Sequence, residues 1–402
     1  MRAEKYLGGK SAWIGLFPVH VSTPIDLASK INFRAPAHLH GSFDSVWVYE
    51  NELFSQGNGW EILIDECIRL LCSKGYLIIR TRDSQYGTLF ELKSFLARNF
   101  CSVVDLETQW NLSNGDTISV FGVARLEIEK YSNRSWTIGI ISNGAKSNNV
   151  CALANKLIKL AKNHPLQIVI AGPEDLVLPN HVIGSQEQWI DREGDSLARI
   201  GEKKRWIINQ AKHVNVAIFH DRYQVDDDFF SGFDSYGMDF DFISIKQRYD
   251  SGSYYPSYVG FPERKMLWQR VEYDHSYRTL HAGHFINGGL IILKKHVADV
   301  INFNALLLHN EAEDVELSFS MRAHGIIPRM NIYSNAVTVG IRDNHTASFK
   351  EISVRTVNNK YQFLKVIVSI LRRSGSKLPA SVKKKIINSK AYAKFNKYLH
   401  LN

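Results

Sequence analysis

The chain is poor in cysteine, and its few cysteines show no pattern that would give them a structural task. Only four of the 402 residues are cysteine, namely Cys67, Cys72, Cys101 and Cys151. Their spacing fits neither a metal-binding finger nor a disulfide-rich scaffold. A reducing compartment is therefore the expected setting.

Long apolar runs are also missing. The first stretch, MRAEKYLGGKSAWIGLF, has no apolar core long enough for a secretory signal peptide. No later stretch approaches the roughly 20 apolar residues that a membrane-spanning helix needs. The sequence predicts a cytoplasmic protein, or one that lies peripherally on the inner face of the cell membrane.

Acidic residues are nearly missing from the last part of the chain. Residues 350–402 contain 13 lysines and arginines but one acid, a charge of +12, whereas the whole chain carries +9. Residues 1–349 are therefore mildly acidic, at about −3. This distribution argues against a nucleic-acid surface over the whole body and favours an anionic partner for the C-terminal part alone.

The basic part mixes its charges with apolar residues at helical spacing. YQFLKVIVSILRR (361–373) and ASVKKKIINSKAYAKFNKYL (380–399) both have this pattern. Helices of this kind bind anionic lipid surfaces, so we predict that residues 350–402 form a basic amphipathic helical tail that docks on an anionic membrane surface. A nucleic-acid arm and a pair of solvated helices that cover the core are the alternatives.

Residues 1–132 have the pattern of a small α/β domain. Apolar periodicity predicts a helix that ends at a glycine stop, a second helix, and strands before, between and after them. The expected elements are a strand in 43–53, a helix in 60–75, a buried strand in 76–82, a helix in 88–100 and a strand in 118–127.

The stretch FDSVWVYENEL…LIDECIRLLCSKGYLIIRTR (43–82) resembles the second half of a class I S-adenosylmethionine-dependent methyltransferase. That family binds its cofactor at a glycine-rich strand–turn–helix, and residues 1–42 have no G-x-G-x-G after a strand. Gly57 and Gly59 are expected to be turn residues. The resemblance implies a shortened, methyltransferase-like domain over residues 1–132 that lacks the cofactor.

Residues 133–349 begin with a strand–helix–strand unit. WTIGIISNG (136–144) and LQIVIAGPED (166–175) read as buried strands, and NNVCALANKLIKLAKNH (148–164) reads as the amphipathic helix between them. A helix in 195–213 then leads to a third parallel strand, VNVAIFHDRY (214–223). Open α/β sheets of this type bind ligands beyond the carboxyl ends of their strands. No dinucleotide-binding or P-loop motif follows either of the first two strands.

The third strand ends in His220-Asp221-Arg222, after a helix that carries Asn209 and Ala211. This order resembles the nucleotide-sugar glycosyltransferases of the GT-A fold, especially family 2, over residues 133–349. The resemblance implies a Mg²⁺ or Mn²⁺ ion that neutralises the diphosphate of a nucleotide-sugar donor, UDP-sugar above all. It assigns Asp221 to the metal and Arg222 to the diphosphate. The usual second aspartate is replaced by Tyr223.

The stretch NEAEDVELSFSMRAHG (310–325) matches the Glu-Asp motif of the same family. The resemblance implies that Asp314 is the general base that takes the proton of the acceptor hydroxyl, and that Glu313 orients groups beside it. The alternative is purely structural, since carboxylates stabilise a helix N-terminus.

Several further residues are expected around the donor. HAGHFINGGLIILKK (281–295) has a turn before a strand, where glycine lets the backbone approach a sugar. The resemblance implies donor contacts by Asn287 and Gly288 and a late metal-binding histidine, with His281 and His284 as weaker candidates. The assigned residues are Asn287, Gly288 and, in the base pocket, Ser142, Asn143, Glu174 and Asp175, with His345 as the metal ligand. Any of these can instead be simple turn or loop residues.

Two other stretches have structural interpretations. The run Asp226-Asp227-Asp228 is expected to be a solvated acidic turn that caps the next helix. IPRMNIYSNAVTVGIRDNH (327–345) is expected to form a pair of strands that ends at His345.

Together these patterns predict a metal-dependent hexosyltransferase that transfers a sugar with inversion to a lipid-linked or oligosaccharide acceptor, in bacterial surface polysaccharide (O-antigen or capsule) synthesis. A non-catalytic adaptor that tethers partners to a membrane or nucleic acid is the alternative from another class. A saccharide methyltransferase is the enzymatic alternative.

Overall fold

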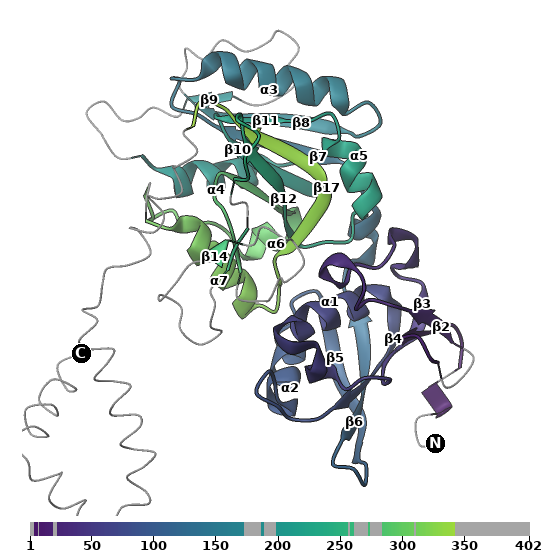
Figure 1. Ribbon diagram of the computed structural model, residues 1–402. Coiled ribbons are helices and arrows are strands. Elements are labelled where there is room, and N and C mark those ends of the chain that lie inside the picture. Colours follow the sequence, from purple (N-terminus) through teal and green to yellow (C-terminus); the bar gives the residue numbers. More distant parts are fainter. Residues whose placement is uncertain are drawn as a thin grey trace, which may run out of the picture. The chain divides into compact units, whose positions relative to one another are not determined.

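The computed structural model (Figure 1) describes residues 4–6, 8–18, 22–172, 186–188, 198–255, 258–260, 272–273, 284–308 and 311–341. Contacts along the chain divide it into one compact unit, residues 1–352, and a second unit, residues 353–402. The second unit, and with it the predicted basic tail, lies outside the described residues. No helix within the described ranges is long and apolar enough to cross a membrane.

The first sheet has six strands in the order β2-β1-β3-β4-β6-β5. The strands β1 to β4 pair in parallel, whereas β6 is antiparallel to both β4 and β5. The strands are β1 (Ser11–Ile14), β2 (Thr23–Ile25), β3 (Phe43–Val48), β4 (Leu71–Thr81), β5 (Ser102–Asn111) and β6 (Thr117–Arg125). The helices are α1 (Trp60–Leu70) and α2 (Leu89–Ala97), and the 3-10 turns are η1 (Glu4–Tyr6), η2 (Ile31–Phe33), η3 (Ala37–Leu39), η4 (Leu53–Gly59) and η5 (Ile128–Ser132).

The sequence predicts three of the six strands, β3, β4 and β6, and both helices, but it misplaces one helix end. α1 ends at Leu70 and β4 follows at Leu71, so Gly75 lies inside a strand and is not a helix stop. A Cβ atom at Gly75 would lie 2.7 Å from the carbonyl oxygen of Asp44, so the glycine is there for a close approach of two strands. The edge strand β5 was not predicted, because most of its residues are polar and some of its apolar residues are exposed, so its apolar signal is weak.

The second sheet has eight strands in the order β11-β17-β12-β16-β10-β7-β8-β9, and β13, β14 and β15 form a small third sheet. The strands are β7 (Trp136–Ile141), β8 (Leu166–Gly172), β9 (Gln186–Gln188), β10 (Asn215–His220), β11 (Tyr223–Val225), β12 (Phe242–Tyr249), β13 (Tyr258–Gly260), β14 (Glu272–Tyr273), β15 (Phe285–Ile286), β16 (Leu290–Lys294) and β17 (Arg329–Thr338). The helices are α3 (Ser147–Leu160), α4 (Ile200–Gln210), α5 (Phe229–Tyr236), α6 (Lys295–Val300) and α7 (Glu313–Ala323).

The centre of this sheet confirms the predicted parallel order. β7 pairs in parallel with both β8 and β10, and all residues of β7 are buried. α3 and α4 pack on opposite faces of these strands and contribute to two different apolar clusters (Figure 1). A helix that joins parallel strands runs back against them, so α3 and α4 both begin at the carboxyl ends of the strands.

The predicted strand pair in residues 327–345 is wrong within the described part of the chain. A single strand, β17, runs from Arg329 to Thr338. It pairs with β12 in parallel through a register shift between Ile245 and Lys246, and also with β11 in the antiparallel sense. The shift bends β17, so that this one strand pairs with both β12 and β11. The sequence pattern of the bent strand resembles that of two separate strands.

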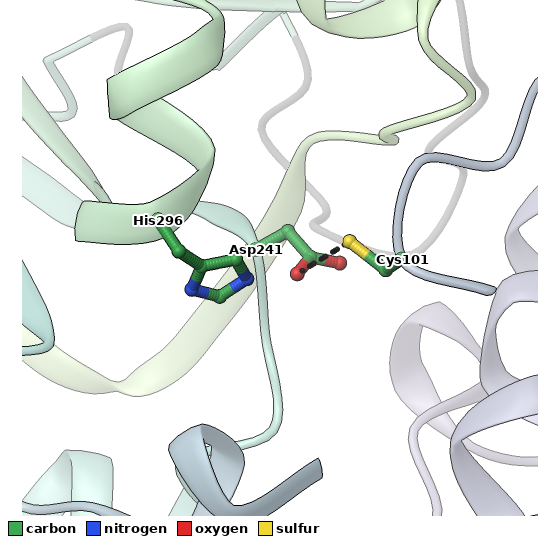
Figure 2. A group of neighbouring side chains, drawn as sticks. All are labelled: Cys101, Asp241 and His296. Carbon is green, nitrogen blue, oxygen red and sulfur yellow. Dashed lines mark hydrogen bonds between the residues drawn. The ribbon is translucent and has the colours of Figure 1, made fainter. Parts of the chain in front are cut away.

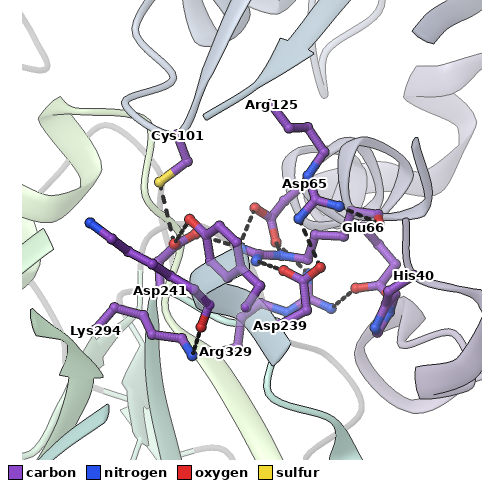
Figure 3. A network of polar contacts seen from close by, with 12 residues as sticks. His40, Asp65, Glu66, Cys101, Arg125, Asp239, Asp241, Lys294 and Arg329 are labelled. Carbon is purple, nitrogen blue, oxygen red and sulfur yellow. Dashed lines mark hydrogen bonds and ion pairs between the residues drawn. The ribbon is translucent and has the colours of Figure 1, made fainter. Parts of the chain in front are cut away.

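Buried charges join the two large sheets. At one end of the network Cys101, Asp241 and His296 lie together (Figure 2). Asp241 also accepts a hydrogen bond from Arg69 of α1 at 2.5 Å, and Arg125 of β6 donates to Asp239 at 2.8 Å (Figure 3). The network contains four arginines and four carboxylates, Arg34, Arg69, Arg125 and Arg329 with Asp65, Glu66, Asp239 and Asp241. In this seam between the two sheets, the arginines and carboxylates are equal in number, and His40 and Lys294 belong to the same network.

The same seam is also apolar. One buried cluster contains side chains from α1 and β4 of the first sheet together with side chains from α4 and β10 of the second. The predicted domain boundary at residue 132 stays a prediction, since residues on both sides of it share this core.

Candidate functional site

The predicted crevice at the carboxyl ends of β7 and β10 brings Ser142 and Asp221 together. The Ser142 hydroxyl donates to Asp221 Oδ2 at 2.9 Å, and the Asp221 amide donates to the Ile141 carbonyl at 3.0 Å. Asn149 of α3 donates to the Asp221 carbonyl at 2.5 Å. Side chain and backbone of Asp221 are both fixed, so its carboxylate has a defined direction.

The Asn287-Gly288-Gly289 turn meets the first turn of α7. The Gly288 amide donates to Asp314 Oδ2 at 2.7 Å, and the Val315 amide donates to Asp314 Oδ1 at 2.9 Å. A Cβ atom at Gly288 would lie 2.8 Å from Glu313 Oε1. The close approach at Gly288 is therefore to the Glu-Asp pair, and the predicted approach to a sugar stays a prediction.

Asp314 has an unusual protonation equilibrium for a carboxylic acid. Burial and the negative charge of Glu313 raise its pKa from 3.8 to about 6, although Lys204 and the two amides act in the other direction. A carboxylate with a pKa near neutral can take a proton from a hydroxyl and return it to water.

Two lysines in the first turn of α4 complete this edge, and the sequence analysis missed both. Lys204 is fully buried and donates to Glu313 Oε1 at 2.8 Å and to the Gly288 carbonyl at 2.7 Å. Lys203 donates to the Ser142 carbonyl at 3.2 Å. The sequence holds a signal for them, because each lysine precedes a buried isoleucine, Ile207 or Ile208, by four residues and so lies on the buried face of the helix.

Arg222 lies beside the same turn. Its Nη2 donates to the Tyr255 hydroxyl at 3.2 Å, and a Cβ atom at Gly289 would lie 2.9 Å from that nitrogen. Its Nε atom is buried and has no hydrogen-bond partner among the described residues. Interactions with Tyr255, Tyr223 and Asp221 outweigh burial and raise the pKa of Arg222, so the guanidinium stays charged.

The residues around Asp221 do not by themselves fit a divalent metal ion. Tyr223, which stands where the resemblance would place a second acid, is fully buried and donates its hydroxyl to Gln247 at 2.7 Å. Burial raises the pKa of Tyr223 well above its usual value, so the phenol stays neutral and is a poor metal ligand. The predicted partner ligand, His345, lies outside the described residues.

One other set of side chains has the composition of a metal site. Within the described ranges, Cys101, Asp241 and His296 are the one group of three whose ligand atoms lie within 4.8 Å of one another (Figure 2). Burial raises the pKa of the Cys101 thiol well above its usual value, whereas Arg69 lowers that of Asp241 against the effect of burial. The thiol and the Tyr131 hydroxyl both donate to Asp241, at 3.3 and 2.6 Å, as members of the charge network.

The remaining predicted residues fall into two groups. Asn143 is exposed and accepts from the Ala145 amide at 3.1 Å, as a turn residue does, and His284 is buried just before β15. Glu174, Asp175, His281 and His345 lie outside the described residues, so their assignments stay predictions.

The acidic run before α5 is structural, but the predicted cap is wrong, because the Asp228 side chain makes no capping hydrogen bond to α5. Asp228 is the residue before α5 and accepts from the Asn335 amide at 3.0 Å. Asp226 pairs with Arg248 at 2.8 Å, and the exposed Asp227 pairs with Lys156 at 3.0 Å.

Comparison with known proteins gives no family. No protein-family model matches the sequence, and no curated protein matches it. Solved structures do match. Residues 1–349 of TarS from S. aureus, in complex with UDP-GlcNAc, are 12% identical over 53% of this chain and 61% of that chain, with a TM-score of 0.36.

Two further solved structures match a similar share of this chain at similarly low identity. GalNAc-T7 with UDP, GalNAc and Mn²⁺ is 11% identical over 55% of this chain and 46% of its own, with a TM-score of 0.38. A Drosophila β1,4-galactosyltransferase 7 mutant with manganese, UDP-Gal and xylobiose is 7% identical over 57% of this chain and 79% of its own, with a TM-score of 0.32. Likenesses of this size assign neither a family nor an activity to this chain.

Proposed function

We propose that this chain is a glycosyltransferase that moves a hexose-type sugar from a nucleotide-sugar, UDP-sugar above all, to a glycan hydroxyl with inversion at the anomeric carbon. The observation that carries the proposal is Asp314, a half-buried carboxylate with a pKa of about 6 that is hydrogen-bonded to the Gly288 amide. It lies at the edge of the sheet where ligands of open α/β folds bind.

In this reaction the acceptor oxygen forms a bond to the anomeric carbon as the bond from that carbon to the diphosphate oxygen breaks. The bonding electron pair leaves with the nucleoside diphosphate, and Asp314 takes the hydroxyl proton. Glu313 is held by Lys204 at 2.8 Å and fixes the position of its neighbour. Direct displacement of this kind inverts the configuration.

The donor side of the site uses the carboxyl ends of β7 and β10. Ser142 and Asp221, joined at 2.9 Å, follow these two strands, and Asn287 lies in the turn that contacts Asp314. We assign the nucleotide to the two loops that carry Ser142 and Asp221, and the sugar to the turn that carries Asn287. Asn143, Glu174 and Asp175 remain proposed contacts for the base.

A scaffolding role is proposed for the first sheet. Glu50, at the carboxyl end of β3, accepts from the Trp13 indole at 3.1 Å and from the Phe17 amide at 2.8 Å. A Cβ atom at Gly15 would overlap the same carboxylate. These contacts tie the loop after β1 to the residue that follows β3, and a shortened methyltransferase-like domain that binds no cofactor stays part of the proposal.

The cellular setting belongs to the proposal as well. We assign the chain to bacterial surface polysaccharide synthesis, with a lipid-linked or oligosaccharide acceptor and with the basic residues 350–402 on an anionic membrane. Co-sedimentation of the full chain with vesicles that contain anionic lipid, but not with neutral vesicles, is the expected result. Equal sedimentation with anionic and neutral vesicles would contradict the proposed binding of residues 350–402 to an anionic membrane.

The alternative from another class is a non-catalytic adaptor, which is favoured by Tyr223 in place of a second acid. A panel of UDP-, GDP- and CMP-sugars separates the two functions. The transferase should bind one donor and hydrolyse it slowly without an acceptor. If no member of the panel binds with or without Mn²⁺, the adaptor becomes the better interpretation.

A further inference from the structure

We infer that cationic side chains of this chain, Lys203 and Arg222, neutralise the diphosphate of the donor, so that donor binding needs no divalent metal ion. The inference rests on the proposed function. It reverses the metal requirement that the sequence predicts from Asp221 and His345.

The first observation is the set of possible metal ligands around Asp221. A divalent cation of the Mg²⁺ or Mn²⁺ type is normally held by several hard oxygen ligands. Beside Asp221 the next candidate position is occupied by Tyr223, whose hydroxyl is buried and donates to Gln247. Asp221 Oδ2 itself is already the acceptor of the Ser142 hydroxyl. One partly committed carboxylate is a weak site for such an ion.

The second observation is the position of Lys203. Its ammonium donates to the carbonyl of Ser142, the residue whose hydroxyl contacts Asp221. The ammonium therefore lies at the carboxyl ends of β7 and β10, where the resemblance expects the metal and the diphosphate. An ammonium has three donors, and a phosphate oxygen is a strong acceptor for them.

The third observation is Arg222. Its guanidinium is packed over the Tyr223 ring at 5.8 Å and lies against the glycine turn that contacts Asp314. Its Nε is buried without a hydrogen-bond partner among the described residues. A buried donor of this kind costs stability unless something binds it, and a diphosphate oxygen is a suitable acceptor.

The charge of the whole edge agrees with this assignment. Both α3 and α4 begin here, and helix N-termini carry partial positive charge. Lys146 stands at the start of α3 and donates to the Val339 carbonyl at 3.1 Å. Among the described residues of this edge, Lys146, Lys203 and Arg222 therefore add positive charge beside the two helix N-termini.

In the transfer step these cations act on the leaving group. When the bond from the anomeric carbon to the diphosphate oxygen breaks, that oxygen keeps the electron pair and gains negative charge. Lys203 and Arg222 can donate hydrogen bonds to the diphosphate oxygens without changing their own protonation. The acceptor proton goes to Asp314, so no other reactant is needed.

Calorimetric titration of the full chain with UDP, GDP and CDP tests the inference, each in excess EDTA and again with Mn²⁺ or Mg²⁺. One nucleotide should bind in EDTA with an affinity within about two-fold of that with metal. Lys203→Met and Arg222→Met should each weaken it at least ten-fold in EDTA. Lys203→Arg should retain most of the affinity, which separates loss of charge from loss of fold. Lys159→Met, an exposed lysine of α3, is the matched control.

The outcomes are distinct. Binding that is seen with Mn²⁺ or Mg²⁺ and lost in EDTA would overturn the inference and leave the proposed function standing. Binding in EDTA that survives both methionine variants would also overturn it. If none of the three nucleotides binds under any condition, the inference and the proposed function fall together.

Discussion

Asp314 is the residue on which the function depends most. Its pKa of about 6 means that the folded protein favours the protonated acid more than an unfolded chain does. Keeping it ionised at neutral pH therefore costs stability, and a residue kept at such a cost is a candidate for chemistry.

The pH dependence of turnover follows from this pKa. Because the base must be ionised, kcat should fall as the pH drops through about 6, with one proton taken up. The sign for stability is the opposite, since the raised pKa makes the ionised form the costly one above pH 6. A pH profile of kcat that stays flat between pH 5 and pH 8 would contradict this role.

Lys204 is a positioning residue, and its effect should be visible in the same profile. Its positive charge lowers the pKa of Asp314, so Lys204→Met should move the acidic limb of the kcat profile to higher pH. The single variant leaves Glu313 buried without its partner, which costs about 3–5 kcal/mol in such pairs. The double variant Lys204→Met/Glu313→Gln removes both charges and should recover stability without recovering the kcat of the native chain.

At the scale of elements, the turn between β15 and β16 and the start of α7 act as one unit. A Cβ atom at Gly288 would lie 2.8 Å from Glu313 Oε1 and 3.0 Å from the Cβ of Asp314. Gly288→Ala should therefore push the Glu-Asp pair away and reduce kcat about 100-fold, because small displacements of reacting groups are costly. Steady-state rates and melting curves check this prediction.

Gly8→Ala provides the control for that variant. No atom lies within 4 Å of a Cβ built at Gly8, so this change should leave both rate and stability near those of the native chain. Equal rates for the two variants would show that the turn does not position the pair.

The elements also show what a sequence can predict. The strand–helix order from β7 to β10 and the start of α7 at Glu313 were predicted, because buried strands and amphipathic helices leave strong periodic signals. β5 and the end of α1 were not, because a polar edge strand has no such signal and a glycine can mean either a stop or a close approach.

At the scale of the whole molecule, the seam between the two large sheets is held by buried ion pairs. Arg69 alone contacts Asp65, Asp239 and Asp241. Arg69→Met would leave Asp241 without its arginine, although Arg329 still pairs with Asp65 and Arg125 with Asp239. Loss of one partner of a buried pair typically costs about 3–5 kcal/mol. Denaturant unfolding should show this loss.

Arg82→Met is the matched control, because Arg82 pairs with Asp116 but its side chain is 54% exposed. Exposed ion pairs contribute about 1 kcal/mol or less. If the two substitutions destabilise the chain equally, the seam is not the source of its stability.

Acid should weaken the ion pairs in the seam between the two large sheets and so lower the stability of the chain. The neighbouring arginines hold the pKa values of Glu66, Asp239 and Asp241 below their ordinary values, against the effect of burial. A lowered pKa gives stability that is present above the ordinary value and is lost as the pH falls toward the folded-state value. The contribution of these three carboxylates to stability should therefore be constant across neutral pH and fall steeply below about pH 4, whereas Arg69→Met should flatten this acid limb.

Long-range contacts explain why the sequence revealed only part of the site. The acids of the Glu-Asp motif and of the strand end were identified locally, but their partners are distant in sequence. Lys204 meets Glu313 across 109 positions, and Arg69 meets Asp241 across 172. No local pattern in a single sequence identifies such pairs. The two lysines on the buried face of α4 are an exception, because their spacing to the buried isoleucines indicates that they are buried.

The most direct measurement is turnover of the donor that binds in the panel, by the native chain and by Asp314→Asn side by side. We expect Asp314→Asn to bind the donor within about two-fold of the native affinity, because its amide oxygen can still accept from Gly288. Its turnover should fall at least 100-fold, in line with the loss of a general base. Turnover by Asp314→Asn at the native rate, or no turnover of any donor by the native chain, would contradict the account.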